Sequence, residues 1–150
     1  MLDQSAAPSP ANKTIFLKDY RTPNFLVDSV ALDFELGETV TSVISKLIIR
    51  RNADVAADVP LVLDGEQLEL TRLELDGNQL DKTEYELGGD QLIIAEVPDK
   101  FELVSTVLIK PQENTQLSGL YKSSGNFCTQ CEAEGFRRIT FFPDRPDVLS

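Results

Sequence analysis

Residues 29–50 read SVALDFELGETVTSVISKLIIR and predict a long β-hairpin. Between Ser29 and Leu36 the apolar residues occupy every second position, which places them together on one face of a half-buried strand. The segment from Thr39 to Arg50 is rich in β-branched side chains and suits a second strand that pairs with the first. Gly37 and Glu38 lie between the two segments and predict the turn.

A hexapeptide motif repeats in the middle of the chain and predicts further hairpins. It reads LDGEQL at 63–68, LDGNQL at 75–80 and LGGDQL at 87–92. Asp-Gly and Gly-Gly favour tight hairpin turns, so the three copies predict a β-meander. A solenoid would need more repeats, and a calcium site would need its aspartates in one loop.

The alternation returns at residues 101–109 and ends at Pro111, which cannot donate a ladder hydrogen bond. No helical period precedes that proline. We therefore expect an all-β fold, either a twisted antiparallel or mixed sheet or a sandwich of hairpins.

The domain limits follow from composition. Residues 1–13 are small, polar and proline-containing, which predicts a flexible leader, and residues 14–150 form one β domain. Near its end the chain is apolar without a later strand to cover it, so we expect a domain incomplete at the C-terminal end. The residues concerned are Ile139, Phe141, Phe142, Val148 and Leu149.

Composition excludes several classes of function. The 150 residues include no histidine, which excludes a Ser-His-Asp triad and an H-E-x-x-H zinc helix within this chain. A net charge of −11 argues against nucleic-acid binding. No apolar run is long enough to span a membrane, and no signal peptide precedes the domain. With two cysteines, the expected location is the cytoplasm.

Acidic residues gather between Ala53 and Leu103, a segment with 14 acidic and 3 basic residues. A solvated outer face is the main interpretation, and a surface for a basic partner is the alternative.

Two pairs of side chains near the end of the chain are candidates for a functional site. Cys128 and Cys131 form C-x-x-C, which predicts two half-buried thiols, with a redox or metal role as the alternative. Glu132 and Glu134 would point the same way from an extended segment. We expect these carboxylates to be solvated or to form salt bridges with Arg137 and Arg138. A glycosidase pair is disfavoured, because its two carboxylates lie on opposite sides of the substrate.

Three stretches carry a family resemblance. TQCEAEGFRRITFFPDRPDVL at 129–149, LSGLY at 117–121 and KDYRTPNF at 18–25 resemble the bacterial aminopeptidase N family of zinc aminopeptidases. The resemblance covers roughly residues 16–150. It implies the β-rich N-terminal domain of an enzyme that removes N-terminal residues from peptides.

The resemblance also implies site residues. Glu132 matches the carboxylate that binds the α-amino group of the substrate, and Gln130 matches the glutamine that lines the first side-chain pocket. The resemblance implies zinc in the parent enzyme, with ligands and catalytic residues in a catalytic domain that this chain lacks. We therefore expect the isolated chain to be inactive. The alternative is a stand-alone β-sandwich binding module that uses the surface from Leu117 to Arg138.

Overall fold

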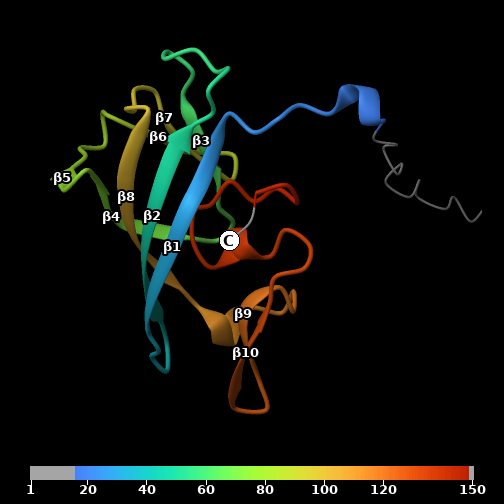
Figure 1. Cartoon of the computed structure of the whole chain (residues 1–150). Helices are drawn as coiled ribbons and strands as arrows, with labels where there is room; N and C mark the ends of the chain where they lie inside the picture. Colours follow the sequence, from blue (N-terminus) through green and yellow to red (C-terminus); the bar gives the residue numbers. More distant parts are fainter. Residues whose placement is uncertain (1–15, 149–150) are drawn as a thin grey trace, which may run out of the picture.

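The computed structural model describes residues 16–148, which contain ten strands and three short 3-10 helices. Figure 1 shows their arrangement. No helix in this range is long and apolar enough to cross a membrane. The strands are β1 (Phe25–Glu35), β2 (Thr41–Arg51), β3 (Leu61–Asp64), β4 (Glu69–Leu75), β5 (Asn78–Gln79), β6 (Glu86–Gly88), β7 (Gln91–Ile94), β8 (Lys100–Ile109), β9 (Gly119–Ser123) and β10 (Asn126–Gln130). The 3-10 helices are η1 (Leu17–Asp19), η2 (Pro111–Glu113) and η3 (Phe136–Arg138).

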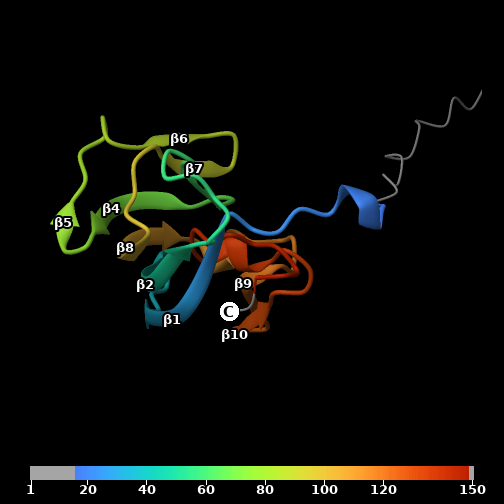
Figure 2. The ribbon, with the colours of Figure 1, turned by 45° about the horizontal axis from the view of Figure 1, so that its top comes forward.

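The prediction of an all-β fold is confirmed: the strands form three antiparallel sheets. The largest has the order β1-β2-β8-β4-β5, a second has the order β3-β7-β6, and β9 and β10 form a hairpin. In Figure 2 the hairpin of β6 and β7 lies above the strands β1, β2 and β8 of the large sheet. One hydrophobic core joins the layers, because buried residues of all three sheets belong to a single cluster.

The predicted hairpin at 29–50 is confirmed by the pairing of β1 with β2. Val30 lies opposite Leu47 and Phe34 opposite Val43, so the alternating residues face the core side of the sheet. β1 is the edge strand, however, and the second layer covers it only in part. Phe34 remains 37% exposed, whereas its partner Val43 is fully buried.

The alternation predicted at 101–109 forms β8 in the middle of the large sheet. Its core-facing residues are all buried, and the remaining positions on the strand are half-buried or exposed. Pro111, two residues after the end of β8, is the first residue of η2 and is buried. The central strand β8 and its neighbour β2 thus both alternate strictly along their whole length.

The predicted meander is right for two motifs and wrong for the first. Asp76 and Gly77 both have positive φ and join β4 to β5, and Gly89 and Asp90 do the same between β6 and β7. By contrast, β3 pairs with β7 and β4 with β8, so the 63–68 copy crosses between two sheets. Its glycine serves close packing, since a Cβ on Gly65 would lie 2.4 Å from the Phe141 ring.

The expectation of an uncovered apolar stretch near the C-terminus is also wrong for the described residues. Ile139, Phe141, Phe142 and Val148 are between 2% and 8% exposed. The segment folds back onto the sandwich, where the Phe142 backbone exchanges two hydrogen bonds with that of Asp64, at 2.9 and 3.1 Å. This long-range bridge joins the C-terminal segment to β3. The predicted leader at 1–13, and Leu149, lie outside the described residues.

Phe142 gives a test of this packing. Its ring is 2% exposed and meets Phe136 edge-on at a centroid distance of 4.8 Å. We expect Phe142→Ala to lower the free energy of unfolding by about 3–5 kcal/mol, because it leaves a cavity in the core. Phe34→Ala is the matched control at a partly exposed site and should cost about 1 kcal/mol. Urea unfolding of both variants measures the difference, and equal losses would contradict the described burial.

Candidate functional site

The two predicted site residues lie at and just after the end of β10. Gln130 is the last residue of the strand and pairs with Gly119 of β9, and Glu132 lies in the turn that follows at 131–135. Both side chains are exposed. The peptide bond between Glu132 and Ala133 is cis. The turn leads directly into η3, next to the start of β9.

The expectation that Glu132 and Glu134 share one side of an extended segment is wrong. The chain turns at these residues and Glu134 has a positive φ of 62°, so the two-residue period of a strand does not apply. Glu134 forms an ion pair with Arg137 at 3.6 Å, as the salt-bridge interpretation predicts. Within residues 16–148, Glu132 forms no ion pair and no side-chain hydrogen bond. The two carboxylates therefore differ: Glu134 is paired with Arg137, and Glu132 faces solvent.

Gly135 fixes the path of the turn. Its backbone N–H donates to the Cys131 carbonyl at 3.0 Å. A Cβ at this position would lie 2.5 Å from the Gln130 carbonyl oxygen and 2.8 Å from the Ser118 hydroxyl oxygen. Because the backbone closes so tightly on itself here, only glycine fits. The closed turn thus contains Glu132 and directly follows Gln130.

Arg137 connects the turn to the rest of the domain. Its Nε donates to Asp144 Oδ2 at 3.1 Å, its backbone N–H donates to the same oxygen at 3.1 Å, and its Nη2 donates to the Asp144 carbonyl at 3.0 Å. The Arg137 Nη2 atom also lies 3.9 Å from Asp64 Oδ2. Burial opposes the charge, but the bond to Asp144 and the nearby carboxylates outweigh it and raise the pKa of Arg137. Sequence reasoning did not find Asp64 or Asp144, since nothing local links these distant residues to the turn.

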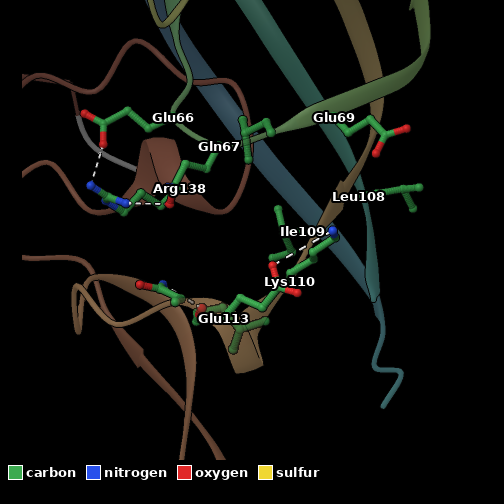
Figure 3. Close-up of a pocket in the computed structure, with 11 residues that line it drawn as sticks. Glu66, Gln67, Glu69, Leu108, Ile109, Lys110, Glu113 and Arg138 are labelled. Carbon is green, nitrogen blue, oxygen red and sulfur yellow. Dashed lines mark hydrogen bonds and ion pairs between the residues drawn. The ribbon is translucent and has the colours of Figure 1, made fainter. Parts of the chain in front are cut away.

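Arg138 points the other way, towards the crossover between β3 and β4. Its guanidinium pairs with Glu66 at 2.7 Å and donates to the Gln67 side-chain oxygen at 3.0 Å. Figure 3 shows these contacts at one wall of a cavity of about 360 Å³, which also contacts η2 and β8. Neither Gln130 nor Glu132 lines this cavity, so it is separate from the candidate site.

The two cysteines are free and half-buried, as the simpler interpretation predicts. Desolvation, with a smaller effect of Asp144, raises the pKa of the Cys131 thiol. A raised pKa disfavours the reactive thiolate form. Within the described range, no three His, Cys, Asp or Glu side chains come together as a metal site.

The fold is similar to that of solved peptidases. No family model matches the chain. Its fold matches an M1 zinc metallopeptidase of Deinococcus radiodurans, with a TM-score of 0.66 at 14% identity over 83% of this chain and 30% of that protein. Aminopeptidase A of Legionella pneumophila, solved with aspartic acid, gives a TM-score of 0.79 at 36% identity over 87% of this chain and 16% of that protein. The antiparallel β architecture of this chain is therefore shared with part of each of these two larger proteins.

The chain is also similar in sequence to several curated proteins named aminopeptidase N. Aminopeptidase N of Caulobacter vibrioides is 49% identical over 138 residues, which are 92% of this chain and 16% of that protein. As the resemblance predicts, the chain is similar to bacterial aminopeptidase N proteins, at 38–49% identity over 88–92% of its length. It spans about a sixth of the length of the curated relatives that it matches.

The closure of the turn at Gly135 is testable. We expect Gly135→Ala to lower the free energy of unfolding by about 1–3 kcal/mol, because the new methyl group meets rigid backbone. Gly88→Ala is the matched control, since nothing lies within 4 Å of its added Cβ. Chemical denaturation of both variants measures the costs, and an unaffected Gly135→Ala protein would rule out the described close approach.

Proposed function

We propose that this chain is the substrate-anchoring part of a zinc aminopeptidase, a peptidase that removes N-terminal residues from peptides. In this proposal Glu132 binds the α-ammonium group of the substrate, and Gln130 lines the pocket for its first side chain. The observation that carries the proposal is the exposed Glu132 carboxylate, unpaired within residues 16–148, on a turn that Gly135 and Arg137 hold in place.

The chemistry of the two groups suits this role. An α-amino group has a pKa of about 7.7–8.0 and is mostly an ammonium ion at neutral pH. A carboxylate accepts a charge-assisted hydrogen bond from it, roughly twice as strong as a neutral one. An internal peptide segment offers no ammonium and would leave the carboxylate unpaired. The same residue thus binds chain ends and disfavours internal segments.

The relatives support the proposal in two ways. Three curated relatives at 38–49% identity are named aminopeptidase N. The Legionella protein was solved with aspartic acid, a free amino acid that carries an α-ammonium group of the same kind. Carried over to this chain, these names point to peptide substrates with free amino termini.

The zinc of such an enzyme does not fit the residues of this chain. The sequence contains no histidine, and no group of three potential ligands forms between residues 16 and 148. We therefore place the zinc ligands and the catalytic residues in the parent enzyme outside this chain. The part of the reaction that we assign to this chain is binding and orientation of the peptide. We place the parent enzyme in the cytoplasm.

The role of Glu132 is testable in the full-length enzyme. Glu132→Gln keeps the shape of the side chain but removes its charge, and a hydrogen bond to a charged group contributes about 1.5–3 kcal/mol. We therefore expect kcat/KM on amino-acid amides to fall by about 10- to 100-fold, with bound zinc unchanged by metal analysis.

Glu134→Gln is the matched control, because it removes an equal charge two residues away while Glu132 stays in place. We expect its loss to be several-fold smaller. Equal losses in the two variants, or wild-type activity of Glu132→Gln, would refute the anchoring role.

The isolated chain gives a second test. We expect the purified 150-residue chain to release no amino acids from amide substrates, with or without added zinc, because it lacks the ligands for the metal. A fluorogenic aminopeptidase assay measures this. Turnover that a chelator abolishes would overturn the assignment of catalysis to the rest of the parent enzyme.

A further inference from the structure

We propose that Arg137 is a positioning residue that holds the turn at 131–135 and thereby sets the affinity of Glu132 for the α-ammonium group. This inference rests on the proposed function. Within residues 16–148, Arg137 forms no ion pair or side-chain hydrogen bond with Glu132. It acts through Glu134, which belongs to the same turn as Glu132.

The contacts of Arg137 divide into two sets. On the turn side, Nη2 lies 3.6 Å from Glu134 Oε2. On the domain side, the residue makes three hydrogen bonds to Asp144 and lies 3.9 Å from Asp64. Asp64 is the residue whose backbone bridges Phe142, so this second set belongs to the sealed core. The guanidinium is therefore the side-chain link between the turn and the rigid part of the fold.

Charge explains why the position of the turn depends on this residue. One cation faces three carboxylates, those of Asp64, Glu134 and Asp144. The Arg137 and Asp144 side chains are only 18% and 13% exposed, so water screens the charges less than at the open surface. Without the cation the three carboxylates repel one another. Glu134, which is 59% exposed and lies in the turn, is the one free to move away.

Movement of Glu134 moves Glu132, because the closed turn contains both. A displacement of about 1 Å in a substrate-positioning group can cost on the order of 100-fold in rate. The planar guanidinium also offers a fixed fork of donors, which a lysine ammonium does not reproduce.

Arg138 provides a matched control within the same 3-10 helix. Its side chain is also 18% exposed and it also forms an ion pair and a side-chain hydrogen bond. Its partners, Glu66 and Gln67, lie in the crossover between β3 and β4 and not in the turn (Figure 3). The two arginines thus differ in whether their side chains form an ion pair or hydrogen bond with residues 131–135.

The experiment compares Arg137→Met, Arg137→Lys and Arg138→Met in the full-length enzyme. The readouts are kcat and KM for amino-acid amides, and inhibition constants for two matched inhibitors, one with an α-amino group and one with hydrogen in its place. We expect Arg137→Met to weaken the amine-bearing inhibitor about tenfold and raise KM, with little effect on the inhibitor without the amine. Arg137→Lys should recover part of the loss. Arg138→Met should weaken both inhibitors by less than about twofold, with a similar loss of thermal stability.

A double variant separates this inference from the proposed function. In a Glu132→Gln background, Arg137→Met should cause no further loss, because the two residues act in series. Losses that multiply, or equal weakening of both inhibitors, would overturn the positioning role while leaving the role of Glu132 intact. If Glu132→Gln itself binds the amine-bearing inhibitor normally, the proposed function fails instead.

Discussion

The ion pair between Arg137 and Asp144 is the interaction on which the candidate site depends. It joins η3 to the segment that closes the sandwich, and its neighbour Asp64 joins that segment to β3 through the backbone of Phe142. Asp64 and the nearby Glu134 and Asp144 thus meet at one guanidinium, although Asp64 is distant in the sequence. Such a network is stable only when every member keeps its partner, because a lone charge left half-buried is costly.

A second guanidinium joins loops elsewhere in the domain. Arg51, with a side chain only 3% exposed, pairs with Asp99 and donates to the carbonyl groups of Ala56, Val59 and Val97. Its guanidinium also lies over the Phe25 ring at 4.8 Å. The planar fork of an arginine satisfies several loop carbonyl groups at once. Both ends of the sandwich therefore use the same physical device.

A fixed turn with one unengaged carboxylate suits a binding role. A flexible carboxylate would lose conformational freedom when it bound an ammonium ion, and that loss would weaken binding. Gly135 and Arg137 order the turn before any ligand arrives, so less freedom remains to be lost. Glu134, in contrast, has its charge occupied by Arg137 and is part of the support. Two similar carboxylates in one turn thus have different roles because of their surroundings.

Local sequence patterns predicted the strands, the three hairpins β1/β2, β4/β5 and β6/β7, and the similarity to aminopeptidase N. Alternation in β1 and β8 and the positive φ of Asp76 and Gly77 are local properties, set by the two-residue period of a strand and by the residues that a tight turn tolerates. Only the tertiary structure decided that the first hexapeptide motif crosses between sheets, that Phe142 is buried, and that Arg137 binds Asp144. The motif at 63–68 has the same local signal as its copies, but its flanking strands pair with β7 and β8 and not with each other. Contacts between residues far apart in the chain depend on how the layers pack, and no local pattern specifies that packing.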